Sequence, residues 1–265
     1  MSDAVKFENI EAIILDKDGV FVDFHKVWLR VIAYRAQLIA ERASNTSDEL
    51  IAIRNACIAC MGVDEDLDTI DPFGPNSMPK DSVRFALATA LYLTKNGMDP
   101  NFGWAHSFDV VDACMLQARE DLNVVELTEE IPGATDKIKE ISEKFTVAIY
   151  TSDTEQNTIA SLDKLGIAAC VAEELQAGAI KTGDNYEALC QRLGVNPQNT
   201  ILITDGPNDI KAAKACGAKT IAVLSGVLED DANLKIVRDL TDEVIDSLAD
   251  LDLNNIDGSK KKVSA

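Results

Sequence analysis

Two carboxylates one residue apart follow an apolar segment near the start of the chain. Residues 12–15 are all apolar, Asp16 and Asp18 come soon after, and Gly19 follows. Because side chains alternate along an extended strand, the two carboxylates point roughly the same way. Two like charges held this close are costly unless a cation or a shared proton relieves them. The spacing therefore predicts a metal-supported acid site at the end of the first strand.

Three further groups of polar residues lie at the predicted ends of later strands or in the loops beyond them. They are Thr151 with Ser152 and Asp153 after residues 146–150, Lys181 in the loop 178–184, and Asp205 with Asp209 after residues 200–204. A parallel sheet gathers the carboxyl ends of its strands along one edge, where ligands bind. All four groups can therefore converge on one site.

The combined set suits the transfer of a phosphoryl group. Three or four carboxylates in a chain with only two histidines favour a hard cation bound by oxygen, above all Mg²⁺. A hydroxyl and an ammonium group suit the phosphoryl oxygens, and a carboxylate beyond phosphorus can be the nucleophile. The carboxylate two residues on can protonate the leaving alcohol and then deprotonate the attacking water. Phosphoryl transfer needs little more than such positioning and charge neutralisation.

Each group taken alone also has an ordinary structural interpretation. Asp-x-Asp-Gly is often a turn or a calcium loop, and Thr151, Ser152 or Asp153 could cap a helix. A lone lysine in a loop is usually solvated, and Asp205 before Gly-Pro is typical of a turn that leads into a helix. The joint order of the groups, each after its own strand, favours the functional interpretation.

The elements that must position these residues fall into two kinds. Residues 134–223 alternate between strand and helix patterns, including a short strand near 169–172, which indicates a parallel sheet covered on both faces. Four helical patterns without a strong strand fill the region from 23 to about 122. We therefore predict an α/β fold: a doubly wound parallel-sheet core, 1–22 and 126–265, interrupted by an all-helical insert, 23–125, that acts as a lid. The tail after residue 251 is expected to be solvated and disordered.

Composition excludes several classes of partner. The 265 residues carry 45 acidic and 25 basic side chains, a net charge of −20 that repels nucleic acid and anionic lipid. No apolar run approaches the ~20 residues that span a bilayer, and the N-terminus lacks the pattern of a secretory signal. We therefore expect a cytoplasmic protein without nucleic-acid or membrane partners. The six cysteines are expected to be reduced thiols, because Cys57 and Cys60 lack a second pair to complete a zinc site.

The four motifs in this order resemble the haloacid dehalogenase-like superfamily, in its phosphatase branch with a helical cap after the first strand. The resemblance implies a Rossmann-like core in which Asp16 is the nucleophile and Asp18 the general acid and base. It further implies phosphate binding by Thr151, Ser152 and Lys181, and Mg²⁺ held by Asp16, Asp205, Asp209 and the backbone carbonyl of Asp18. Two positions depart from the family pattern: Thr204 replaces the usual glycine, and Thr182 follows Lys181 where many relatives have proline.

The resemblance implies a Mg²⁺-dependent phosphomonoester hydrolase that works through an aspartyl-phosphate and acts on a small phosphorylated metabolite, as phosphoglycolate phosphatases do. Asp18 is shared with the phosphosugar mutases of the superfamily, which are one alternative, and a catalytically silent binding protein is another. The sequence leaves monomer and homodimer open. Substrate choice is expected from the insert, with these candidates: His25, Lys26, Trp28, Arg30, Lys80 and Arg84. The plain alternative is that Trp28 packs inside the insert and Arg84 is solvated.

Overall fold

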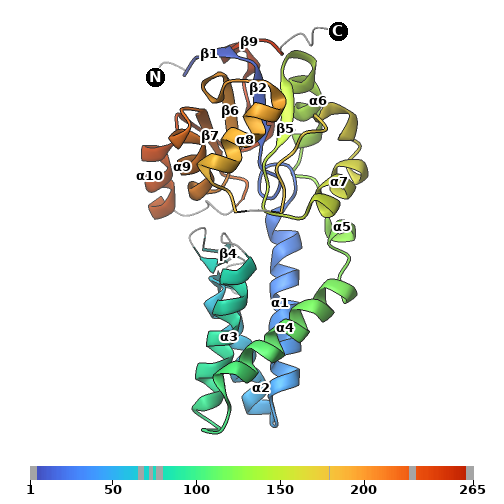
Figure 1. Ribbon diagram of the computed structural model, residues 1–265, viewed down its shortest axis with the longest axis vertical. Helices are drawn as coiled ribbons and strands as arrows, with labels where there is room; N and C mark the ends of the chain where they lie inside the picture. The colour runs from blue at the N-terminus through green and yellow to red at the C-terminus, as the bar shows by residue number, and fades with distance from the viewer. Residues whose placement is uncertain are drawn as a thin grey trace. The chain divides into compact units, whose positions relative to one another are not determined.

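The computed structural model (Figure 1) describes residues 5–64, 69–71, 74–75, 80–178, 180–226 and 231–260, without the side chains of residues 69, 80 and 231–233. The chain divides into two compact units. One comprises Met1–Phe24 and Thr128–Ala265, and the other is His25–Leu127. The first unit contains the sheet, and the second contains the inserted helices. Each division lies two residues beyond the boundary predicted from the sequence.

The first unit is built on a five-stranded parallel sheet with the order β5-β2-β6-β7-β8. The strands are β2 (Ala12–Leu15), β5 (Thr146–Ile149), β6 (Thr200–Thr204), β7 (Lys219–Val223) and β8 (Glu243–Ile245). Ile14 lies in register with Ala148 on one side and Leu202 on the other. In chain order this arrangement is 2-1-3-4-5, so the connections reverse direction between β2 and β6, where doubly wound sheets bind their ligands.

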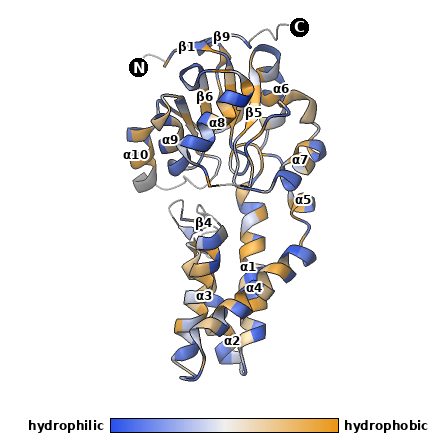
Figure 2. Ribbon diagram, in the orientation of Figure 1, coloured by the Kyte–Doolittle hydropathy of each residue, from blue (hydrophilic) through white to orange (hydrophobic). Residues whose placement is uncertain are grey.

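Both faces of the sheet are covered, as the sequence predicts. Ile14, Ala148 and Leu202 pack in one core cluster with Tyr186 and Leu189. The alternate residues of these strands, which point to the other face, are buried as well, and Figure 2 shows β5 and β6 as largely hydrophobic. The helices of this unit are α6 (Ala134–Lys144), α7 (Glu155–Lys164), α8 (Gly183–Leu193), α9 (Pro207–Ala215) and α10 (Asp231–Leu240). The predicted doubly wound α/β core is confirmed.

The strand predicted near residues 169–172 is wrong in kind and position. A 3-10 helix, η2 (Ala168–Cys170), occupies most of this segment. The neighbour of β5 is instead the extended segment 172–176, where the Ala172 and Gln176 amides donate to the carbonyls of Val147 and Ile149. This segment contains two exposed glutamates. It therefore lacks the run of apolar residues that predicts a strand inside the sheet.

The prediction of a disordered tail after residue 251 is also wrong for residues 252–260. β9 (Ile256–Gly258) pairs in parallel with β1 (Phe7–Ile10), and Ile256 lies opposite Phe7. Both side chains are buried, and the Lys260 amide donates to the Lys144 carbonyl at 2.7 Å. Burial of the Phe7–Ile256 pair fixes a segment whose composition alone indicated solvent. Residues 261–265 of the predicted tail lie outside the described part of the chain.

The insert consists mainly of helices, which confirms the predicted helical insert. They are α1 (Phe24–Ala43), α2 (Ser47–Cys60), α3 (Lys80–Asn96), α4 (Trp104–Asp121) and the short α5 (Val124–Leu127). A two-residue antiparallel pair, β3 (Val63–Asp64) with β4 (Thr69–Ile70), is added to them. Thr46 caps α2 by accepting the Glu49 amide. The buried Lys95 ammonium of α3 lies 2.6 Å from the Glu49 carboxylate of α2, so an ion pair ties these helices together.

The cysteines are free thiols throughout. Burial raises the pKa of Cys60 to about 11 and that of Cys190 to about 12, so both remain protonated at neutral pH. Among the described residues, no helix combines the length and apolar character that crossing a membrane requires.

Candidate active site

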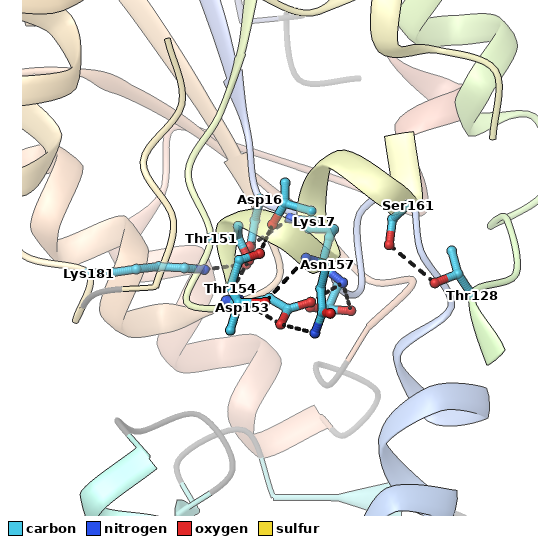
Figure 3. Close-up of polar contacts among 11 residues, drawn as sticks. Asp16, Lys17, Thr128, Thr151, Asp153, Thr154, Asn157, Ser161 and Lys181 are labelled. Atoms are coloured by element: carbon cyan, nitrogen blue, oxygen red, sulfur yellow. Dashed lines mark hydrogen bonds and ion pairs between the residues drawn. The ribbon is translucent and has the colours of Figure 1, made fainter. Parts of the chain in front are cut away.

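Three side chains from distant parts of the chain meet beyond the end of β2. The Lys181 ammonium lies 2.6 Å from Asp16 Oδ2 and 2.6 Å from Asp209 Oδ2. Asp16 directly follows β2, Asp209 is in the first turn of α9, and Lys181 lies just before α8. Figure 3 shows Lys181 pointing toward Asp16 and Thr151. The sheet therefore brings together the predicted residues of the first, third and fourth motifs.

The charges of this cluster are strongly perturbed. Burial and, to a smaller extent, the negative charge of Asp209 raise the pKa of Asp16 to about 6, against the attraction of Lys181. Burial also lowers the pKa of Lys181, but its two carboxylate partners more than compensate and hold that pKa above its usual range. The lysine is therefore a permanent cation, whereas Asp16 carries a charge that its surroundings incompletely balance.

Thr204, at the end of β6, connects the same two carboxylates. Its hydroxyl oxygen lies 2.9 Å from Asp209 Oδ2 and 3.3 Å from Asp16 Oδ2. The hydroxyl also accepts the Gly206 amide at 3.0 Å. Since a hydroxyl has one proton to donate, it serves one carboxylate at a time. The Thr204 side chain is thus integrated into the acidic cluster.

Asp205 lies against two glycines. A Cβ atom at Gly19 would lie 2.1 Å from Asp205 Oδ2, and one at Gly226 would lie 1.9 Å from it. Gly19 also has a φ of +81°, which side chains rarely adopt. The glycine after the Asp16–Asp18 pair therefore has two functions. It allows the turn, and it gives the Asp205 carboxylate room beside the loop that carries Asp18.

Thr151 lies two residues after β5, at the edge of this cluster, and is 2 % exposed. Its amide donates to the Gln176 carbonyl at 2.8 Å, and its hydroxyl accepts the Asp153 amide at 3.2 Å. Helix α7 is capped by Thr154, which accepts the Asn157 amide, so the capping alternative for residues 151–153 does not hold. Ser152 is exposed.

Lys17 is a further residue of the site, and the four predicted groups do not include it. Its side chain is fully buried, and its ammonium lies 2.9 Å from Asp18 Oδ1 and 3.0 Å from Asp153 Oδ2. Burial raises the pKa of Asp18, and the Lys17 charge partly offsets that rise. The sequence contains one signal for this role: Lys17 directly follows four apolar strand residues and one aspartate. A charged side chain is not expected at such a buried position unless it has a partner of opposite charge.

The donor atoms suit a hard cation. Asp16, Asp205 and Asp209 offer only oxygen ligands, and the buried carboxylates outnumber the single ammonium of Lys181. Within the described ranges, no three acidic, histidine or cysteine side chains are already arranged as a metal site. The Lys181 ammonium bridges Asp16 and Asp209 instead. A cation would therefore share these two carboxylates with the lysine.

The candidates in the insert differ in what the structure shows of them. Arg84 forms an ion pair with Asp112, with Nη2 2.6 Å from Asp112 Oδ2, and its guanidinium lies 4.5 Å from the centre of the Phe108 ring. Its charge is therefore already matched. His25, Lys26, Trp28 and Arg30 belong to the first part of α1, and the Lys80 side chain lies outside the described atoms. A substrate role for any of them stays a prediction.

The doubly wound parallel sheet, the helical unit inserted after β2 and the carboxylates beside the reversal of strand order define the class of fold: an α/β protein with a helical insert. The sequence matches the haloacid dehalogenase-like hydrolase family over residues 10–217 and a HAD-hydrolase-like family over residues 184–251. The chain belongs to the haloacid dehalogenase-like hydrolases, which are generally phosphatases and typically use Mg²⁺. A comparison with curated proteins gives no match.

Solved structures share the fold at low sequence identity. A protein predicted to be a phosphoglycolate phosphatase, from Haemophilus somnus, has a TM-score of 0.62 and 16 % identity, with 91 % of this chain and 96 % of that chain covered. A protein assigned as a β-phosphoglucomutase, from Thermotoga maritima, has a TM-score of 0.54 and 17 % identity over 91 % and 95 %. A family hydrolase from Deinococcus radiodurans, with bound phosphate and sodium, has a TM-score of 0.55 and 20 % identity over 92 % and 94 %.

Proposed function

We propose that the protein is a Mg²⁺-dependent phosphomonoester hydrolase that works through a phosphorylated Asp16. The observation that carries this proposal is the largely buried contact of Lys181 with both Asp16 and Asp209, with Asp18 two residues after Asp16. Phosphoryl transfer through an acyl phosphate requires a nucleophile, a fixed cation and a second carboxylic acid. In this proposal they are Asp16, Lys181 and Asp18.

In the first step, an Asp16 carboxylate oxygen attacks phosphorus and forms a new P–O bond. The ester P–O bond on the opposite side breaks, and its electron pair leaves with the alcohol oxygen. Asp18, as the neutral acid, donates its proton to that oxygen, so the products are an alcohol, the Asp16 acyl phosphate and the Asp18 carboxylate. Lys181 and the Thr151 hydroxyl hold the phosphoryl oxygens.

In the second step, a water molecule opens the acyl phosphate. The Asp18 carboxylate takes a proton from the water while the water oxygen bonds to phosphorus. The bond between phosphorus and the Asp16 oxygen breaks. Inorganic phosphate leaves, Asp16 is again a carboxylate and Asp18 again an acid. Mg²⁺, held by Asp16, Asp205, Asp209 and the Asp18 carbonyl, would neutralise charge on the phosphoryl group.

The substrate proposal is a small phosphorylated metabolite, and the insert 23–125 is proposed as the lid that selects it. The structural likeness to a predicted phosphoglycolate phosphatase supports a small phosphorylated acid. His25, Lys26 and Arg84 are the proposed contacts for a second anionic group, and Arg84 would have to exchange its ion pair with Asp112 to make such a contact. The match to an assigned β-phosphoglucomutase and the presence of Asp18 support phosphosugar mutase chemistry as the second candidate.

Steady-state hydrolysis of p-nitrophenyl phosphate tests the proposal. We expect activity with Mg²⁺ and loss of that activity when a chelator is added. We expect Asp16→Asn to lower kcat by about 10⁴-fold, since the proposed mechanism uses Asp16 as its nucleophile. Undiminished activity in Asp16→Asn would remove the nucleophile assignment. A second assay separates the candidates: glucose 6-phosphate formed from β-glucose 1-phosphate without net phosphate release identifies a mutase. Ligand binding without turnover across a broad ester panel identifies a silent binding protein.

A further inference from the structure

Lys17, the residue between Asp16 and Asp18 in the sequence, is a buried cation that the proposed chemistry does not use. The Lys17 side chain has no exposed surface, whereas lysines are almost never fully buried unless paired. Its two partners are Asp18 and Asp153, at 2.9 Å and 3.0 Å. These partners belong to different loops, one after β2 and the other after β5.

The main chain of Lys17 is fixed as firmly as its side chain. Its carbonyl accepts the amides of Phe21 and Val22, each at 3.1 Å, and the Gly19 amide donates to the Val22 carbonyl at 2.8 Å. The loop that carries Asp18 is therefore wound around Lys17. The ammonium then holds the Asp18 side chain itself, through its Oδ1 atom.

Asp153 is a fixed anchor on the other side. Its Oδ1 atom accepts the Thr154 amide at 2.7 Å and the Asn157 side-chain amide at 3.0 Å, as Figure 3 shows. Its own amide donates to the Thr151 hydroxyl. Among the described residues, buried Asp153 Oδ2 has no hydrogen bond, so Lys17 balances it as an ion pair alone. Lys17 thus links Asp18 to the loop that carries Thr151.

We propose that Lys17 is a positioning residue that holds the Asp18 carboxyl group at a set distance from the loop that binds the phosphoryl group. This inference rests on the proposed function. Asp18 acts on the leaving oxygen, and the Thr151 loop holds the phosphoryl oxygens. Because Lys17 connects the Asp18 carboxyl group to the Thr151 loop, it fixes the position of the proton donor relative to the ester P–O bond that breaks.

A positioning role for Lys17 affects different leaving groups unequally, whereas a purely structural role affects them alike. An alkyl alcohol must receive a proton as it leaves, so hydrolysis of an alkyl phosphate depends on the placement of Asp18. p-Nitrophenolate leaves as an anion and needs little help. Without Lys17, the alkyl ester should therefore lose much more rate than the aryl ester, although both use the same nucleophile.

The experiment measures kcat/KM with Mg²⁺ for β-glycerol phosphate and p-nitrophenyl phosphate. We expect Lys17→Met to lower kcat/KM about 100-fold for the alkyl ester and less than about five-fold for the aryl ester. Lys17→Arg, which keeps the charge, should restore most of the alkyl activity. Lys95→Met is the matched control, because Lys95 is also a nearly fully buried lysine with a carboxylate partner. It should affect both esters equally.

Thermal unfolding by circular dichroism shows whether each variant is folded. If Lys17→Met does not fold, the double variant Lys17→Met/Asp153→Asn carries the same test, because it leaves no unpaired charge at residue 153. Equal losses for both esters, or no recovery in Lys17→Arg, would overturn the positioning role. If the wild-type protein hydrolyses neither ester, the proposed hydrolase function itself is wrong, and that result is distinct from an equal loss in the variant.

Discussion

Individual carboxylates of the cluster are fixed by residues from other segments. Asp16 and Asp209 share the Lys181 ammonium and the Thr204 hydroxyl, and Asp205 lies against Gly19. The residue types and their order were enough to predict that Asp16, Lys181 and Asp209 could converge, because each follows a recognisable strand or loop signal. The contribution of Thr204 could not be predicted, since it depends on which face of β6 its hydroxyl occupies.

Lys17 shows a second limit of sequence reasoning at this scale. Alternation along a strand places it on the side opposite to Asp16 and Asp18, which suggests a role separate from theirs. The structure differs because the chain turns directly after the strand, and the long lysine side chain reaches back to Asp18. A flexible side chain can cross between the two directions that a strand pattern assigns.

The raised pKa of Asp16 predicts a pH-dependent stability. A carboxyl group whose pKa is about 6 when folded and 3.8 in its ordinary state binds its proton more tightly in the folded protein. Its contribution to stability is fully present below pH 4 and is lost as the pH rises through 6. Asp16→Asn removes this dependence. Without divalent metal, the free energy of unfolding of the variant minus that of the wild type should increase by about 2–3 kcal/mol from pH 4 to pH 7.5.

Urea denaturation of both proteins over that pH range, with chelator present, measures the difference. The change should be confined to the interval between about pH 4 and pH 6.5, where Asp16 loses its proton. A difference between variant and wild type that stays constant with pH would show that the ionised Asp16 is not destabilising. Saturating Mg²⁺ is the internal comparison, because a bound cation favours the ionised carboxylate and should stabilise the wild type more than the variant.

At the scale of elements, the strands with apolar runs were predictable, whereas β8, β9 and the segment 172–176 were not. β2 is a continuous apolar run, and β6 and β7 each contain three consecutive apolar residues that are fully buried, because both faces of the sheet are covered. β8 (Glu243–Ile245) is half-buried, and the segment 172–176 carries exposed acidic residues, so neither shows that pattern. β9 depends on β1, more than 240 residues away, and no local signal reports such a pairing.

The close approach of the loop at Gly226 to Asp205 gives a prediction at this scale. A Cβ at Gly226 would lie 1.9 Å from Asp205 Oδ2, so Gly226→Ala must displace the carboxylate. Because we place Asp205 among the metal ligands, we expect the Mg²⁺ concentration for half-maximal activity to rise at least about ten-fold. Titration of hydrolase activity with Mg²⁺ measures it. Gly103→Ala is the matched control, since nothing lies within 4 Å of the Cβ that it adds. An unchanged Mg²⁺ requirement in Gly226→Ala would contradict the ligand role of Asp205.

At the scale of the whole molecule, the two compact units divide what the sequence could and could not predict. The sheet unit carries motifs whose order is specific, so its fold class followed from them. The insert carries no such order, and its candidate Arg84 is engaged by Asp112 within the same unit. Substrate choice depends on surface side chains of helices, where apolar periodicity reveals the core face and says little about the exposed one.

The net charge of −20 predicts an unusual response to salt. Phosphate esters are anions, so the long-range field of the protein lowers their concentration at the site. Among the described side chains, the only cation contacting Asp16 there is the largely buried Lys181. Raising the ionic strength from 10 to 150 mM shortens the screening length from about 30 Å to about 8 Å. With saturating Mg²⁺, kcat/KM for p-nitrophenyl phosphate should therefore rise about two- to five-fold, mainly through KM. The same rise with sodium acetate as with sodium chloride would exclude an effect of one anion. A fall in kcat/KM would show that local positive charge outweighs the overall field.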